Sequence, residues 1–199
     1  MNQIPNPKLI KPLLDYLNAK HPLSEGYIEL LSNHVKPISV RKNKFILSPV
    51  DNNTYIFFII HGLARGFIKD RNKEITTWFS VGNEFVGAIR NPAQGINPSI
   101  EYLQALDDCE LLAVPYSIID LLYSKFPEAN IIGRKLLAIQ YHAASERSIL
   151  ARIPSAQKRY ERFVEISQVD LNRVPLRCIA SYLGMRLETL SRLRNRSDQ

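Results

Sequence analysis

Two short helix patterns that meet at a single glycine constrain this chain more than any other feature of its sequence. The stretch "LRCIASYLGMRLETLSRLR", residues 176–194, has apolar residues at helical spacing, then a glycine, then a charged helix pattern. A helix-turn-helix needs two such helices at a steep angle and a small residue in the turn. Gly184 fits that turn because glycine takes positive φ without steric cost. We therefore predict helices over 176–182 and 187–196.

The same stretch predicts which side chains of the two helices are buried. Ala180 is small where the helices would cross, and the spacing of Ile179, Leu183, Leu190 and Leu193 suits packing between them. The polar residues left on the outside are Arg186, Glu188, Thr189, Ser191, Arg192 and Arg196. In a DNA-binding helix-turn-helix, the start of the second helix reaches base edges and basic neighbours contact phosphates. The alternative is an ordinary helical hairpin with a charged exterior.

Short β-type segments fill the region between residues 44 and 114. They are Lys44–Leu47, Tyr55–Ile60, Leu63–Lys69, Glu74–Phe79, Ile100–Ala105 and Glu110–Val114. Each is rich in β-branched or aromatic residues, and Gly, Pro, Asn and Asp separate them. This spacing favours a small antiparallel barrel or sandwich over alternating β–α–β units.

Helix patterns flank the β-type region on both sides. Before it, we predict helices over 8–20 and over 24–33, with Ser24 as the N-cap of the second. After it, the predicted helices are Ser117–Lys125, Pro127–Ile153 and Ala156–Ser167.

The long helix carries an apolar seam at heptad spacing. We predict that Ile132, Leu136, Ile139, Ala143 and Leu150 pair it with a second copy of the chain in a homodimer. The alternative is that this helix packs on the β-type region of its own chain.

Composition excludes several classes of protein. No apolar run approaches the ~20 residues that span a bilayer, and the N-terminus lacks a signal region, so we expect a cytoplasmic protein without membrane contact. The two cysteines are far apart, which favours buried thiols. We find no metal-ligand spacing, no GxSxG and no P-loop, so we expect no metal, no cofactor and no enzyme activity.

Charge is concentrated near the end of the chain. The net charge is +7, and residues 146–199 hold eleven Lys or Arg against six Asp or Glu, a net of +5. A basic surface of this kind favours polyanionic partners.

The stretch "PLRCIASYLGMRLETLSRLR" resembles the C-terminal winged helix-turn-helix of the Crp/Fnr family of bacterial transcription regulators. The family's positions are occupied by Ile179, Ala180, Leu183, Gly184, Glu188, Thr189, Leu190, Ser191 and Arg192. The order of parts is also similar, and the ending is most similar to the branch found in Bacteroidetes. The resemblance implies an α+β fold with an N-terminal antiparallel β-roll of the cyclic-nucleotide-binding type over 1–126. A long dimerisation helix over 127–153 and a helix-turn-helix domain over 154–199 would follow.

The resemblance also implies a function, namely sequence-specific binding of double-stranded DNA in transcription regulation. It places Glu188 and Arg192 at base-reading positions and Thr189 and Ser191 at contacts nearby, with Arg186 and Arg196 as flanking basic residues. We expect a β-hairpin at 169–175 to serve as the wing, with Arg173 on a phosphate. RNA polymerase and an unknown small-molecule effector are further candidate partners. The alternative function is a ligand sensor or protein-interaction module that does not bind DNA.

Family members that bind cyclic AMP hold its phosphate with an arginine and its ribose with a glutamate. Here the corresponding candidates are Gly82, Glu84, Phe85, Gly87, Arg90 and Ser99. Ser99 stands where that arginine would be, and the spacing of Arg90 does not fit. A buried phosphate without its cation would cost about 3–5 kcal/mol. We therefore predict that the β-roll does not bind cyclic AMP.

Overall fold

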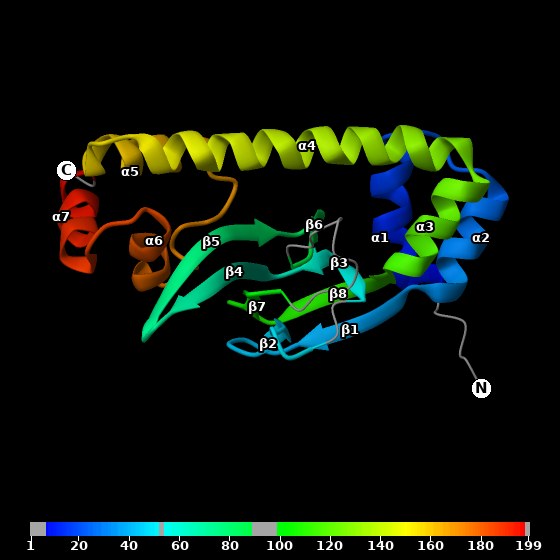
Figure 1. Cartoon of the computed structure of the whole chain (residues 1–199), viewed down its shortest axis with the longest axis horizontal. Helices are drawn as coiled ribbons and strands as arrows, with labels where there is room; N and C mark the ends of the chain where they lie inside the picture. Colours follow the sequence, from blue (N-terminus) through cyan, green and yellow to red (C-terminus); the bar gives the residue numbers. More distant parts are fainter. Residues whose placement is uncertain (1–6, 52–53, 89–98, 198–199) are drawn as a thin grey trace.

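The fold is an eight-stranded β-roll flanked by helices at both ends and bridged by one long helix (Figure 1). The computed structural model describes residues 7–51, 54–88 and 99–197. The strands are β1 (Lys36–Val40), β2 (Phe45–Leu47), β3 (Tyr55–His61), β4 (Leu63–Asp70), β5 (Lys73–Val81), β6 (Glu84–Val86), β7 (Glu101–Ala105) and β8 (Cys109–Pro115). The helices are α1 (Pro7–Asn18), α2 (Glu25–His34), α3 (Tyr116–Lys125), α4 (Pro127–Arg152), α5 (Ala156–Ile166), α6 (Leu176–Tyr182) and α7 (Leu187–Ser197).

The strands form two four-stranded antiparallel sheets. One has the order β1-β8-β3-β6 and the other β2-β7-β4-β5. Side chains alternate between the faces of a strand, so the first sheet contributes side chains to two hydrophobic cores, one on each face. Phe57 and Ile59 of β3 pack between the sheets, whereas Ile56 and Phe58 pack under the helices α1 to α4. The N-terminal helices therefore cover the outer face of this sheet, at one end of the molecule (Figure 1).

The long helix α4 runs along the whole molecule (Figure 1). Near its start, Ile132 is buried in the core beneath α1 to α3, and near its end Leu150 is buried among the C-terminal helices. These two residues therefore do not face a partner helix, which corrects the predicted seam. Heptad spacing gives the period of an apolar stripe but does not say whether the stripe packs on its own chain or on a second copy. Leu136 also packs partly against the first core, while Ala143 is half-buried and Ile139 is exposed.

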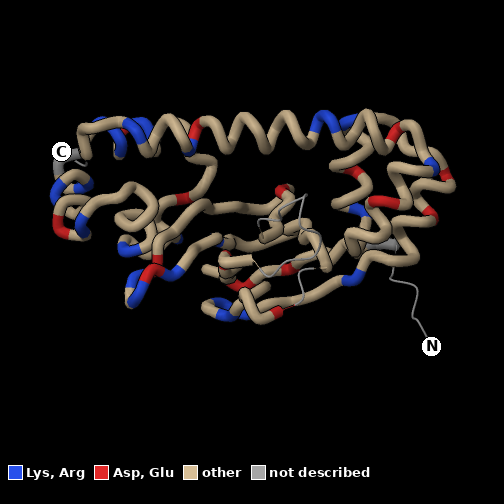
Figure 2. Tube along the Cα trace, in the orientation of Figure 1, with Lys and Arg blue, Asp and Glu red and all other residues tan. Residues whose placement is uncertain are grey.

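A second face of α4 is apolar and exposed. Leu137 and Tyr141 are 69% and 74% exposed, and Ala144 and Ser148 follow on the same side. Residues 136–145 carry no Lys, Arg, Asp or Glu, which leaves the middle of the helix uncharged (Figure 2).

The predicted fold class is confirmed, and all six predicted strands are present with shifts of one or two residues at some ends. The strands β1 and β6 were not predicted. The hairpin predicted at 169–175 is wrong, because that segment forms turns and bends and no strand lies between α5 and α6. No helix in the described part of the chain is long and apolar enough to cross a membrane.

Candidate nucleic-acid interface

The turn between α6 and α7 has a defined hydrogen-bond geometry. Gly184 has φ +60°, and its N–H donates to the Ser181 carbonyl over 3.2 Å. The Met185 N–H donates to the Ala180 carbonyl over 3.0 Å. These two bonds form a Schellman motif, which ends a helix and satisfies its last carbonyls. The glycine that the sequence singles out therefore sets where α6 stops and α7 can begin.

The two helices are held by a buried apolar seam, as predicted. Ile179, Leu183 and Leu190 are each less than 4% exposed, and Ala180 is buried where the helices cross. Leu193 packs partly against the same cluster. Because this seam fixes both helices, the outer face of α7 is a rigid surface.

The outer face of α7 presents polar side chains near its N-terminal end. Arg186, Glu188 and Arg192 are exposed, and Thr189 and Ser191 are half-buried. Arg192 Nε donates to the backbone carbonyl of Glu188 over 3.3 Å. Among the described ion pairs, none joins the Glu188 carboxylate to Arg192. Arg196 lies within α7, but its side chain is outside the described residues.

Lys and Arg positions cluster in and around α7 at this end of the molecule (Figure 2). Arg177 on α6 and Lys158 on α5 are exposed, and sequence reasoning did not select either of them. Arg159 has a structural role instead, since its guanidinium donates to the carbonyls of Leu183 over 2.9 Å and of Ile153 over 2.6 Å. It thereby ties the turn of the helix pair to the end of α4.

The first helix of the pair is docked on the β-roll. Ser181 Oγ accepts a hydrogen bond from the Thr76 N–H over 3.0 Å and donates to the Glu74 carbonyl over 2.7 Å. Arg65 of β4 is buried and pairs with the Glu74 carboxylate and with Gln104. The sequence offers no local signal for this contact, because Ser181 and β5 are about a hundred residues apart.

Arg173 is held by the β-roll. Its Nε and Nη2 both reach Asp107 Oδ2, at 2.9 and 2.5 Å, and Lys42 lies 3.6 Å from the other oxygen of that carboxylate. The arrangement ties the segment before α6 to the β7–β8 loop. The predicted contact of Arg173 with a phosphate therefore stays a prediction, with a competing partner now identified.

The predicted ligand residues of the β-roll are not brought together in one cavity. Glu84 Oε2 accepts from Ser80 Oγ and from the Val81 N–H, so this carboxylate caps the β5–β6 turn. A Cβ at Gly82 would lie 2.9 Å from the carbonyl oxygen of Ile60, so close packing of the backbone favours glycine at this position. Ser99 is buried, and its Oγ accepts from the Glu101 N–H.

Two of the other candidates line a different part of the β-roll. Phe85 and Gly87 line a separate apolar cavity under α1, α3 and α4. Arg90 is outside the described residues.

Both thiols are buried and free, as predicted. Burial raises the pKa of Cys109, and likewise the pKa of Cys178, above the ordinary cysteine value. Cys178 lies in the core of the helix pair, so its thiol acts there as a small apolar group.

This geometry defines a class of protein: a β-roll joined by a long helix to a docked helix-turn-helix whose second helix is exposed. No protein-family model matches the chain. It is 26% identical over 191 residues to the regulatory protein HlyX of Actinobacillus pleuropneumoniae, covering 87% of this chain and 77% of that protein.

Solved structures agree in fold. FixK2 of Bradyrhizobium japonicum has a TM-score of 0.67 at 20% identity and covers 81% of this chain and 83% of its own. A protein described as a Crp/Fnr-family transcriptional regulator, from Eubacterium rectale, also has a TM-score of 0.67, at 18% identity, and covers 90% and 85%. The predicted resemblance to Crp/Fnr-family regulators is thereby confirmed; the Bacteroidetes branch stays a prediction.

Proposed function

We propose that this chain is a sequence-specific DNA-binding transcription regulator of the Crp/Fnr type. The observation that carries the proposal is the exposed polar start of α7, held on a buried apolar seam by the Gly184 turn. An arginine can contact guanine O6 and N7 together, and a glutamate can accept from cytosine N4. Arg192 and Glu188 are the residues that would do so, with Thr189 and Ser191 beside them. Arg173, Arg177, Arg186 and Arg196 are the proposed phosphate contacts.

The proposal includes a homodimer joined through the exposed face of α4. Leu137, Tyr141, Ala144 and Ser148 form that face, and its centre carries no charge. A two-fold dimer would place two copies of α7 on one side of a DNA duplex, about 34 Å or one turn apart. The site it reads would then be near-palindromic. In this account, residues 127–153 join the two copies of the chain, and residues 154–199 contact DNA.

We further propose that the β-roll, residues 1–126, does not bind cyclic AMP. Glu84 is engaged in its own turn, and Ser99 is a buried neutral residue where the family has a cation. Calorimetry with cyclic AMP should show no saturable binding at micromolar concentration. The protein would act on DNA in the cytoplasm, with RNA polymerase as a further candidate partner.

Salt dependence separates this function from that of a protein-interaction module. We expect the full chain to bind labelled duplex DNA in fluorescence anisotropy. Affinity should fall about 10³-fold between 50 and 200 mM salt if some six phosphates are contacted. A chain that acts only through protein contacts would bind no duplex under these conditions, and that result would contradict the proposal.

A further inference from the structure

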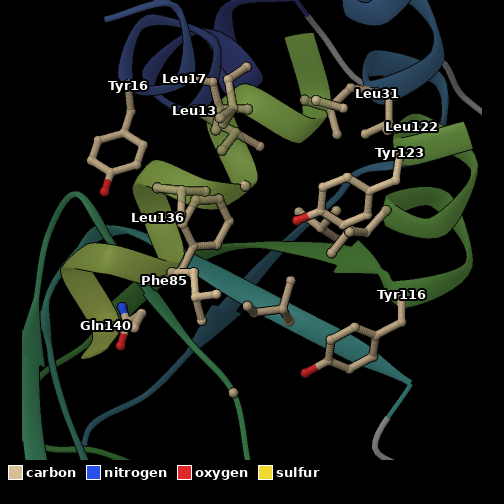
Figure 3. Close-up of a pocket in the computed structure, with 18 of the residues that line it drawn as sticks. Leu13, Tyr16, Leu17, Leu31, Phe85, Tyr116, Leu122, Tyr123, Leu136 and Gln140 are labelled. Carbon is tan, nitrogen blue, oxygen red and sulfur yellow. The ribbon is translucent and has the colours of Figure 1, made fainter. Parts of the chain in front are cut away.

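A large apolar cavity is lined by α1 to α4 and by the outer face of the first sheet (Figure 3). The helices α1 to α3 lie at the end of the molecule away from α7 (Figure 1). The volume of the cavity is about 490 Å³. Protein cores are packed with few voids larger than a water molecule, and small-molecule sites span roughly 300–1,000 Å³. The cavity therefore has the size of a ligand site rather than of a packing fault.

The walls of the cavity are apolar. Leu13 comes from α1, Phe85 from β6, Ile119 from α3 and Leu136 from α4. Among the described residues that line it, none is a Lys, Arg, His, Asp or Glu. Burying an unpaired charge is costly, so these walls select against a phosphate or a sulfonate and favour an uncharged occupant.

A few polar groups interrupt the apolar walls. They come from the tyrosines Tyr16, Tyr27, Tyr116 and Tyr123 and from the amide of Gln140, with Tyr116 and Tyr123 on the opposite side of the cavity from Phe85 and Leu136 (Figure 3). Burial, and then the charge of Glu84, raises the pKa of Tyr16, so its hydroxyl keeps its proton at neutral pH. Neutral donors of this kind suit a hydroxyl or carbonyl oxygen on an otherwise apolar molecule.

Two glycines seat the tyrosines at the cavity wall. A Cβ at Gly133 of α4 would overlap the Tyr123 ring, and a Cβ at Gly87 would come within 3.0 Å of the Tyr116 hydroxyl. The Tyr123 ring and the Tyr116 hydroxyl thus lie directly against backbone, and a side chain at either glycine would displace them.

We propose that this cavity binds a neutral, mostly apolar small molecule that carries a hydroxyl or carbonyl oxygen. Its apolar part would lie against Leu13, Phe85 and Leu136, with its oxygen toward the tyrosine hydroxyls. Because α4 forms one wall, a bound molecule would also contact the helix that carries the proposed pairing face. The site is separate from the DNA-contacting surface, and it does not depend on the proposed function.

Two related dyes test the proposal on the full chain. N-phenyl-1-naphthylamine is neutral, and 8-anilinonaphthalene-1-sulfonate has the same rings with one added negative charge. We expect the neutral dye to bind saturably, one per chain, with a rise in fluorescence. The sulfonate should bind at least about tenfold more weakly, since no cation is found among the described residues that line the cavity.

Variants that fill the cavity locate the site. Ile119→Trp adds a ring from α3 and Leu136→Trp adds one from α4, and each should weaken binding of the neutral dye at least about tenfold. Ser117→Trp adds the same ring at an exposed position of α3 and should leave binding unchanged. Thermal melts identify a variant that loses its fold, in which case the other filling variant decides the question.

Four outcomes would overturn the proposal. One is the absence of saturable binding of the neutral dye to the wild-type chain. Equal binding of both dyes, or unchanged binding in a folded cavity-filling variant, would place the dye on another surface. The fourth is binding that appears only in a Tyr141→Glu variant shown to be monomeric by light scattering, which would mean that a second copy of the chain fills the cavity.

Discussion

Among single residues, Gly184 has the clearest physical role. Its φ of +60° lies in the left-handed region, yet a Cβ built there meets no atom within 4 Å beyond its own chain neighbours. Gly184→Ala should therefore destabilise the protein only through the backbone, by about 1–2 kcal/mol. Gly66→Ala should cost more, because its Cβ would overlap the Trp78 indole. Urea unfolding compares the two variants, and an equal cost would contradict this explanation.

Arg192 is the residue on which sequence preference depends most in this account. Arg192→Ala should lose about 1–3 kcal/mol of binding free energy and relax the base preference at one position of each half-site. Arg134→Ala removes the same charge from an exposed position near the start of α4 and serves as the control. Selection of binding sites by both variants measures the effect. An Arg192→Ala protein with wild-type preference and affinity would show that α7 is not the reading helix.

The buried thiols give the protein a predictable response to alkaline pH. Burial raises the pKa of both Cys109 and Cys178 above the ordinary cysteine value of 9.0. A group with a raised folded-state pKa stabilises the fold below its unfolded pKa, and that contribution is lost as pH rises further. Stability should therefore fall above about pH 9 in urea unfolding. A Cys109→Ala, Cys178→Ala protein should show a smaller fall, and an identical pH profile would contradict this attribution.

At the scale of whole elements, α4 has two faces with different uses. One face packs within its own chain, through Ile132 in the core under α1 to α3 and through Leu150 among the C-terminal helices. The other face exposes Leu137 and Tyr141. Leu137→Glu with Tyr141→Glu should convert a dimer into a folded monomer, because buried like charges would face each other across the two-fold axis. Glu128→Gln, also on α4 but outside this face, is the control. Light scattering decides, and a monomeric wild-type chain would refute the assignment.

Across the whole molecule, local patterns predicted more than long-range contacts did. The Gly184 turn, its buried leucines and six of the strands follow from short stretches of sequence, because turn chemistry and periodicity are local. The short strands β1 and β6 depend on pairing with distant partners, and the contact of Ser181 with β5 depends on how two parts of the chain dock.

The candidate sites divide in the same way. The exposed residues of α7 could be selected from their motif, whereas the ligand residues of the β-roll could not. The resemblance makes Glu84 a ligand candidate, but its carboxylate accepts hydrogen bonds within its own turn. The cavity under α4 is lined by residues from Leu13 to Gln140, and no short pattern brings them together.

The central claim is that two copies of α7 read DNA in one dimer. Sequencing the duplexes that the wild-type chain selects from a random pool tests it most directly. The account predicts enrichment of a near-palindrome whose half-sites are centred about one helical turn, some 34 Å, apart. Selection without any enriched sequence, or of a single half-site without its symmetric partner, would contradict it.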